Sequence, residues 1–252
     1  VHMIVKKFIF DNQEYFEIPK EKISYKSLIV ELKFIFFSDL IWKNLQDSFS
    51  KNYLNIDNLY CSSYVRSSSY NSLFNDFNKK VILDIGHGKS SITVFQDSRI
   101  LYFNILPVGG KHITNDISIL LKIDYFQAEK LKKNLNHSEI IFENKMDKNK
   151  EIKSEDLSNQ VIFARVDEII KLNLADEYFN AFFQNKDNCI LIFIGGGSKI
   201  LNKNSIYLED RFNFFNEMSF FEENTESISR SGFNFLINAN FNEVSFMAKE
   251  PK

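Results

Sequence analysis

The fold is decided by residues 107–117, which read Pro107-Val108-Gly109-Gly110-Lys111-His112-Ile113-Thr114-Asn115-Asp116-Ile117. Before this stretch, the apolar run Arg99–Val108 predicts a strand. After it, the apolar spacing over Ile113–Lys122 predicts a helix. The two glycines at the junction let the backbone turn and approach another segment closely. We therefore expect a strand, a glycine loop and a helix in succession.

The other glycines mark further loops of this kind. The eight glycines of the chain are Gly86 and Gly88, Gly109 and Gly110, Gly195, Gly196 and Gly197, and Gly232. None precedes Gly86, so the candidate site loops all lie in the second two-thirds of the chain.

The first loop, Asp84-Ile85-Gly86-His87-Gly88-Lys89-Ser90-Ser91, could hold phosphate. Glycines let backbone N–H groups converge on phosphate oxygens, and an aspartate can hold Mg²⁺ through water. A P-loop is excluded, because Leu83 stands where its first glycine is needed and Ser91–Phe95 predicts a strand instead of a helix. Alone, the loop is equally consistent with a glycine-containing hairpin that binds nothing.

Further elements follow from apolar periodicity and from capping residues. Asp39–Asn52 shows the clearest helical pattern, and Asp124 is a candidate cap for a helix over Tyr125–Leu135. We also predict strands and helices over these ranges: strands Ile4–Phe10, Glu14–Ile18, Ser27–Phe37, Asn58–Ser63, Lys80–Asp84 and Cys189–Ile194; helices Val161–Leu174, Asp176–Phe183 and Ser227–Ala239. The polar residues 136–160 predict a small exposed subdomain.

Composition excludes several classes of protein. The chain has 252 residues, 44% of them hydrophobic, and 31 basic against 33 acidic residues. This composition is globular, and it offers no basic face for nucleic acid and no polybasic membrane surface. The two cysteines, Cys61 and Cys189, form no metal or disulfide motif, which favours a reducing compartment. No Ser-His-Asp or Cys-His pattern is present, so no catalytic residue is assigned.

The order of the motifs carries a resemblance to a known family. After the first loop come residues 107–117, then Ala128-Glu129 with Lys132, then Arg165-Val166-Asp167-Glu168-Ile169, then Gly195-Gly196-Gly197-Ser198. This series resembles the actin/Hsp70-type ATPase superfamily and, within it, the bacterial FtsA family of cell division proteins. The resemblance extends from about residue 5 to residue 245 and is strongest from 80 to 200.

The resemblance implies an α/β, actin-like (ribonuclease H-like) fold, with a mixed β-sheet flanked by helices and small inserted subdomains. Residues 1–78 would be a remnant of the first domain with its inserted subdomain. Residues 79–111 and 171–252 would form the second domain, and 112–170 a small inserted subdomain. The implied ligand is ATP with Mg²⁺, the metal being held by Asp84 through water. The implied nucleotide-binding residues are Asp84, Gly86, Gly88, Ser90, Gly109, Gly110, Glu129, Lys132, Gly195, Gly196 and Ser198.

The implied function is that of an adaptor of the division ring, in the cytoplasm at the inner face of the cell membrane. Its 112–170 subdomain would bind the C-terminal peptide of FtsZ through Arg165 and Glu168, with other divisome proteins and self-association as further contacts. An ion pair within one helix is an equally good interpretation of these two residues. The C-terminal residues 248–252 have no apolar face, so we expect no direct membrane anchor in this chain.

The chain also departs from the family pattern. His87, Lys89 and Ser91 stand where the family has Gly, Thr and Asp, and Ile194 replaces a threonine. The first phosphate loop of the family is absent. We therefore expect weak ATP binding, at most a weak ATPase activity, and a scaffold in preference to an enzyme. Two alternatives stay open: a PilM-like actin relative of pilus assembly, and an actin-fold ATPase or kinase.

Overall fold

The computed structural model describes residues 2–15, 24–96, 99–134, 154–174, 188–202 and 215–238. The chain divides into two compact units. The first comprises Val1–Leu73, Ser98–Leu101 and Thr225–Lys252, and the second comprises Phe74–Asp97 and Tyr102–Asn224. Each is described by itself. The expected division at 78/79, 111/112 and 170/171 stays a prediction.

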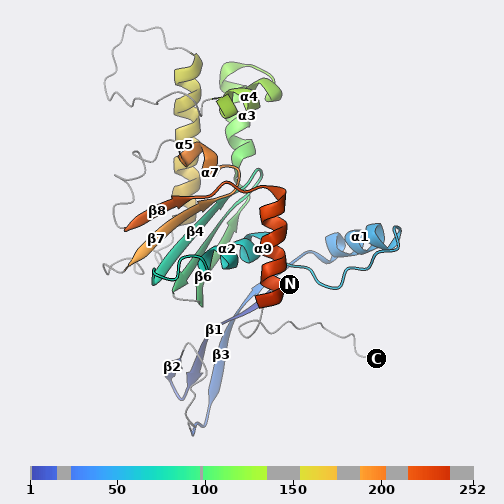
Figure 1. Cartoon of the computed structure of the whole chain (residues 1–252), viewed down its shortest axis with the longest axis vertical. Coiled ribbons are helices and arrows are strands. Elements are labelled where there is room, and N and C mark those ends of the chain that lie inside the picture. Colours follow the sequence, from blue (N-terminus) through green and yellow to red (C-terminus); the bar gives the residue numbers. More distant parts are fainter. Residues whose placement is uncertain are drawn as a thin grey trace. The chain divides into compact units, whose positions relative to one another are not determined.

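The second unit is built on a mixed five-stranded sheet (Figure 1). The strand order is β6-β5-β4-β7-β8. The strands are β4 (Lys79–Ile85), β5 (Ser90–Gln96), β6 (Arg99–Leu106, which belongs to this unit from Tyr102 on), β7 (Cys189–Ile194) and β8 (Glu217–Phe220). β4 pairs antiparallel with β5 and parallel with β7, and β7 pairs parallel with β8.

The central strands β4 and β7 are buried along their whole length. A strand covered on both faces reads as a continuous apolar run, which explains Cys189-Ile190-Leu191-Ile192-Phe193-Ile194. Phe193 of β7 also stacks on Phe220 of β8, with ring centroids 5.0 Å apart. Because these strands form the core, the loops at their ends are held on a rigid support.

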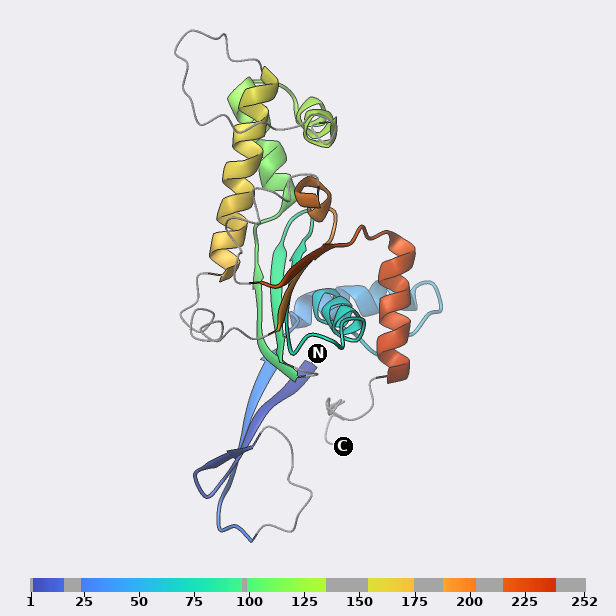
Figure 2. The same ribbon diagram turned by 60° about the vertical axis from the view of Figure 1, so that its left-hand side comes forward.

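The helices of this unit are α3 (Gly110–Leu121), α4 (Tyr125–Asn134) and α5 (Ser154–Leu174), and the short α7 (Ser198–Asn202) follows β7. α5 packs against β5 of the sheet, and α3 and α4 pack on one another and on α5. Ile113 and Ile117 of α3 and Val166 and Ile169 of α5 share one apolar core with Leu83 of β4. α3 and α5 lie side by side in both ribbon views (Figures 1 and 2).

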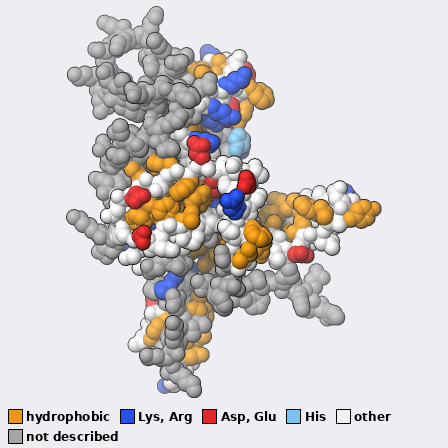
Figure 3. Space-filling view, viewed as in Figure 1, with side chains coloured by type: hydrophobic (Ala, Val, Ile, Leu, Met, Phe, Trp, Pro, Cys, Tyr) orange, Lys and Arg blue, Asp and Glu red, His pale blue; other side chains and the backbone are white. Residues whose placement is uncertain are grey.

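In its described residues, the first unit contains a three-stranded antiparallel sheet and three helices. The strands β1 (His2–Phe10), β2 (Gln13–Tyr15) and β3 (Leu28–Ile35) are arranged in the order β2-β1-β3. The helices are α1 (Asp39–Ser50), α2 (Ser62–Asn71) and α9 (Thr225–Asn238). No residue of α1 is buried, and hydrophobic side chains gather along it (Figure 3).

Most predicted elements in the described residues are confirmed, but the region 58–71 was predicted wrongly. The sequence suggested a strand at Asn58–Ser63 and no helix after it. The structure has no strand there and places α2 at Ser62–Asn71. α2 is rich in serine, which has low helix propensity, yet it packs against α9 and buries Tyr64 and Val65. Tertiary packing therefore overrides local preference.

α5, the strand at Ser91–Phe95 and the region 136–183 bear on further predictions. α5 begins at Ser154, seven residues before the predicted start, so the last part of the expected 136–160 subdomain is the first two turns of this helix. The rest of that subdomain and the helix Asp176–Phe183 lie outside the described residues. The strand Ser91–Phe95, on which rejection of a P-loop depended, is confirmed by β5. Among the described residues, no helix is long and apolar enough to cross a membrane.

Candidate functional site

The start of α3 docks on the hairpin loop between β4 and β5. The N–H of Gly86 donates to the carbonyl of Lys89 at 2.9 Å and closes the turn. The N–H of Gly110 then donates to the carbonyl of Gly86 at 2.9 Å, and the N–H of Lys111 donates to the carbonyl of His87 at 2.6 Å. The two predicted glycine loops are therefore in direct contact.

Gly109 is required by this contact. A Cβ at residue 109 would lie 2.5 Å from the carbonyl oxygen of Gly86 and 2.7 Å from the backbone nitrogen of Lys89. Neither backbone atom can move without opening the turn. Glycine at this position is thus explained by the close approach of two loops, with no ligand needed.

The third glycine loop, after β7, packs on the end of β4. The N–H of Gly197 donates to the carbonyl of Ile85 at 2.8 Å. Gly195 has a φ of +86°, and a Cβ there would lie 2.5 Å from Oδ1 of Asp84. Three loops that are far apart in the sequence therefore meet where β4 ends.

The predicted nucleotide-binding glycines fall into two groups. Gly86, Gly109 and Gly195 lie so close to neighbouring atoms that a Cβ would clash or be crowded. Gly88 and Gly110 would meet nothing nearer than 3.6 Å, and a Cβ at Gly196 would meet nothing within 4 Å. Only this second group leaves room in which a ligand could approach the backbone.

The first turn of α3 offers few free donors. The N–H of Gly109 donates to Nδ1 of His112 at 3.0 Å. The N–H groups of Gly110, Lys111 and His112 all have backbone acceptors. A helix start usually presents open N–H groups to an anion, but here the chain itself uses them. His112 is therefore a capping residue of this helix.

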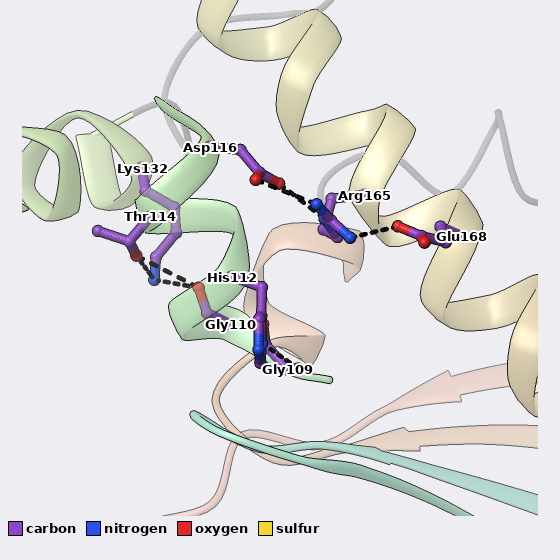
Figure 4. Close-up of polar contacts among 8 residues, drawn as sticks. All are labelled: Gly109, Gly110, His112, Thr114, Asp116, Lys132, Arg165 and Glu168. Carbon is purple, nitrogen blue, oxygen red and sulfur yellow. Dashed lines mark hydrogen bonds and ion pairs between the residues drawn. The ribbon is translucent and has the colours of Figure 1, made fainter. Parts of the chain in front are cut away.

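Lys132 lies in a buried polar cluster between α4 and α3 (Figure 4). Its ammonium donates to the carbonyl of Gly110 at 3.1 Å and to Oγ1 of Thr114 at 2.7 Å. It also pairs with Oε2 of Glu129 at 2.6 Å. An ammonium has three donors, so these contacts satisfy all of them. The structure thus brings predicted Glu129, Lys132 and Gly110 together, with Lys132 already fully bonded.

Glu129 is held in its charged form by this cluster. Burial raises the pKa of Glu129, but hydrogen bonds from Lys132 and Thr114 lower it, and the net pKa lies below the ordinary value. Thr114 Oγ1 donates to Oε2 of Glu129 at 2.5 Å. The cluster is a charged network that ties two helices together.

Three further predicted residues are buried at the loop ends. Asp84 is 3% exposed, and Ser90 and Ser198 are each 1% exposed. Ser90 accepts a hydrogen bond from Nδ2 of Asn173 at 3.0 Å, and the Ser198 hydroxyl lies 2.7 Å from the carbonyl of Gly195. These serines therefore hold α5 and the third loop in place.

The predicted magnesium ligand is Asp84. Within the part of the chain that the structure describes, no three His, Cys, Asp or Glu side chains are grouped as metal ligands. Mg²⁺ bound with nucleotide commonly uses one or two carboxylates together with phosphate and water. The buried carboxylate of Asp84 supplies one protein ligand, which is the smallest number that this pattern requires.

Arg165 and Glu168 lie in a second site, between α3 and α5. Nε and Nη2 of Arg165 donate to Oδ2 and Oδ1 of Asp116 at 2.7 and 3.0 Å. Nη1 donates to Oε2 of Glu168 at 2.5 Å (Figure 4). The hydrogen bond to Asp116 raises the pKa of Arg165, although burial lowers it. The predicted pair within one helix is therefore also a clamp between two helices.

This clamp borders a groove of about 380 Å³. Its lining residues come from α3 and α5: Asp116, Ile119, Leu120, Val161, Ala164, Arg165 and Glu168. Ile119 is 76% exposed and Leu120 48% exposed, so the apolar part of the groove is open to solvent. A shallow, mostly apolar groove with a fixed polar wall is suited to a peptide.

Sequence reasoning missed most of these residues. Asp116 and Thr114 lie inside the motif at 107–117 but were given no role. Ile119 and Leu120 follow Asp116 by three and four positions, and Arg165 and Glu168 follow Val161 and Arg165 by four and three. Spacings of three and four place side chains on one face of a helix, but they do not tell which helix lies opposite.

Solved structures with a similar fold include several actin relatives. The PilM–PilN type IV pilus biogenesis complex aligns with a TM-score of 0.58 at 14% identity, covering 93% of this chain and 64% of that chain. MreB5 of Spiroplasma citri, in a structure bound to AMPPNP, aligns with a TM-score of 0.56 at 17% identity, covering 81% of this chain and 67% of that chain. At such identities the likeness shows the fold, which is actin-like and α/β as expected.

Comparison with known sequences points to a narrower group of proteins than the fold does. Cell division protein FtsA of Bacillus subtilis (strain 168) is 31% identical over 138 residues, which are 55% of this chain and 31% of that protein. FtsA of Helicobacter pylori (strain 26695) is 26% identical over 145 residues, which are 57% of this chain and 28% of that protein. The matched region spans less than a third of these relatives.

The family model for cell division protein FtsA matches residues 81–225. This range is more than half of the chain, and it contains all three glycine loops, the Lys132 cluster and the groove. The chain therefore belongs to the FtsA family of cell division proteins.

Proposed function

We propose that this chain acts as an adaptor of the division ring, and that the groove between α3 and α5 receives the C-terminal tail of FtsZ. The observation that carries the proposal is the groove itself, which combines exposed apolar side chains with the Asp116–Arg165–Glu168 clamp. Both residues that the sequence assigned to partner binding line it. Other divisome contacts, self-association and a place at the inner face of the cell membrane belong to the same proposal.

The clamp supports this function because it fixes the polar wall before a ligand arrives. Arg165 is held from two sides, by Asp116 on α3 and by Glu168 on α5. A side chain that is already ordered loses little entropy when a peptide binds. The exposed Ile119 and Leu120 then supply apolar area that binding would remove from water.

A direct binding measurement tests the proposal. A fluorescently labelled peptide with the sequence of the FtsZ C-terminal tail would be titrated with the chain, and binding followed by fluorescence anisotropy. We expect saturable binding that Ile119→Ser weakens about tenfold, because a well-packed apolar side chain contributes roughly 1–2 kcal/mol. Phe126→Ser is the matched control, since Phe126 is 78% exposed on α4 and does not line the groove. Equal loss in both variants, or no saturable binding, would refute the proposal.

ATP with Mg²⁺ is a second candidate ligand, at the three glycine loops. The observation in its favour is that Gly88, Gly110 and Gly196 leave space beside the loop ends, with exposed Lys89 and Lys111 nearby. MreB5, which shares the fold, has been solved with AMPPNP. Against strong binding, Lys132 and the first N–H groups of α3 are already bonded within the chain. We therefore expect weak binding and a scaffold in preference to an ATPase.

Isothermal titration with Mg-ATP tests this second candidate. We expect weak binding by the wild type and none by Gly88→Asp, because a carboxylate at the loop would repel phosphate. The same change at Gly232 is the control, since a Cβ there would meet nothing within 4 Å and α9 lies in the other unit. No heat of binding by the wild type at millimolar ATP would remove ATP and Mg²⁺ from the proposal and leave the peptide groove untouched.

The PilM-like alternative shares the fold but has less support. The likeness to the PilM–PilN complex is structural, at 14% identity, whereas the family match is to FtsA. A peptide from the partner of a PilM-like protein would serve as a competitor in the anisotropy assay. If it displaced the FtsZ tail with higher affinity, the pilus alternative would replace the division-ring adaptor.

A further inference from the structure

The turn between β4 and β5 presents three consecutive open N–H groups. The N–H of Gly86 closes the turn on the carbonyl of Lys89. The N–H groups of His87, Gly88 and Lys89 have no hydrogen-bond acceptor in the segments that the structure describes. Successive N–H groups on a turn attract an anion, because their partial positive charges add up. The turn therefore offers a phosphate group a short row of backbone donors.

The side chain of Lys111 lies across this turn. Its Cε and Nζ are both 3.6 Å from the point at which a Cβ of residue 88 would stand, so a glycine at residue 88 leaves room for it. The backbone N–H of Lys111 donates to the carbonyl of His87, which fixes the start of α3 on the same turn. Lys111 is exposed, and its ammonium forms no hydrogen bond or ion pair with any described residue. This ammonium is therefore available to an anion beside the open N–H groups.

Lys89 brings a second exposed ammonium to the turn. It too has no ion pair within the described part of the chain. Lys132 differs from these two lysines, because it is buried and bonded to Glu129, Thr114 and Gly110. The two available ammonium groups together carry the same charge as one Mg²⁺ ion.

The carboxylate of Asp84 is far less accessible than these ammonium groups. It is 3% exposed, and its Oδ1 lies against Gly195, where a Cβ would stand 2.5 Å away. The residue paired with it across the hairpin is Ser91, which is neutral. A divalent cation beside the phosphates would thus find one covered carboxylate, whereas the phosphates themselves would find two open ammonium groups.

We propose that Lys111 and Lys89 compensate the charge of the nucleotide phosphates in place of a divalent cation, so that this chain binds ATP in the absence of Mg²⁺. This inference rests on the nucleotide ligand proposed above and names how the charge of that ligand is met. Lys111 reaches the phosphates from α3 and Lys89 from the hairpin, so the ligand joins two loops that already touch.

Titration with ATP in excess EDTA tests the inference, because EDTA removes divalent cations. We expect isothermal titration to give nearly the same affinity in EDTA and in Mg²⁺. In EDTA, Lys111→Met should weaken binding about tenfold, the lower end for a hydrogen bond to a charged group. Lys111→Arg keeps the positive charge and should bind as the wild type does. Mg²⁺ should restore part of the affinity that Lys111→Met loses, since the added cation replaces the missing charge.

A control on the same helix makes the outcome specific. Lys122→Met removes an exposed lysine at the other end of α3, about 16 Å along the helix, and should leave the affinity unchanged. Thermal unfolding without ligand checks that each variant keeps the fold. No binding by the wild type in either buffer would remove ATP from the proposed function and this inference with it. Wild-type binding that requires Mg²⁺, or equal affinities of Lys111→Met and Lys122→Met, would overturn this inference and leave ATP as a ligand.

Discussion

The ammonium of Lys132 on α4 donates a hydrogen bond to the carbonyl oxygen of Gly110 at the start of α3, at a distance of 3.1 Å. The resemblance to the family predicts that Lys132 binds nucleotide, but in the structure Lys132 holds the second glycine loop in place. Together with its bonds to Thr114 and Glu129, this contact makes Lys132 the link between α4 and the loop against which the β4–β5 hairpin rests.

Replacing Lys132 should destabilise the fold. Lys132→Met removes the three contacts of the ammonium at once, so Glu129 loses its shorter ion pair and keeps only Lys133 at 3.4 Å as a cationic partner. Breaking a fully buried ion pair costs about 3–5 kcal/mol; because Glu129 is partly exposed and keeps Lys133, we expect a smaller loss of about 2 kcal/mol. Urea unfolding would measure this loss. Lys130→Met, at an exposed position on the same helix, should change stability by less than about 0.5 kcal/mol. Equal effects of the two changes would contradict the structural role of Lys132.

The same cluster predicts a pH dependence. The pKa of Glu129 is lowered in the folded chain from its ordinary value of 4.5, so the folded state binds this proton less readily than the unfolded state. Its contribution to stability is fully present above the unfolded value and is lost as pH falls through the folded value. The stability difference between wild type and Glu129→Gln, measured by urea unfolding, should therefore narrow as pH falls below 4.5. A difference that stays constant across this range would refute the charged network.

Gly109 and Gly196 should respond very differently to alanine. At Gly109 the new Cβ would lie 2.5 Å from a backbone oxygen, and at Gly196 it would meet nothing within 4 Å. Overpacking against backbone costs about 1–3 kcal/mol or more, whereas an unstrained surface change stays within about 0.5 kcal/mol. Thermal unfolding should therefore give a clearly lower melting temperature for Gly109→Ala than for Gly196→Ala. If Gly109→Ala were as stable as Gly196→Ala, the contact between the first two loops would be wrong.

Asp124 caps α4 and should be replaceable only by another capping residue. Its Oδ1 accepts from the N–H groups of Phe126 and Gln127 at 2.8 and 3.1 Å. Asp124→Ala removes this cap and should lower the free energy of unfolding by about 1 kcal/mol. Asp124→Asn should retain most of the cap's contribution, because asparagine is also a good N-cap residue. Circular dichroism during urea unfolding would give both values. Identical losses in the two variants would show that the cap does not stabilise the helix.

Much of the second unit could be predicted from sequence, because its signals are local. The buried strand Cys189–Ile194 is an unbroken apolar run, and the cap at Asp124 needs only its own helix. The motif at 107–117 predicted both the strand before Gly109 and the helix after it. These are cases in which pattern, propensity and turn chemistry agree.

The features that could not be predicted from the sequence depend on contacts between segments far apart in the chain. α2 is a polar, serine-rich segment whose helix is stabilised by α9, more than 150 residues later in the chain. The clamp between Asp116 and Arg165 joins residues 49 positions apart. The motif drew attention to Arg165 and Glu168, but only the packing of α3 on α5 shows that Asp116 compensates the charge of the arginine.

The course of α3 has one mechanical consequence. Its first residues rest on the β4–β5 hairpin through Gly110 and Lys111, and its middle carries Asp116 into the groove. Gly110 and Asp116 are six positions apart, which is about 9 Å along a helix. One helix therefore has its first turn on the glycine loops and its middle at the groove. Because a helix is stiff over so short a length, we expect a displacement of the hairpin to shift the carboxylate of Asp116 that holds Arg165.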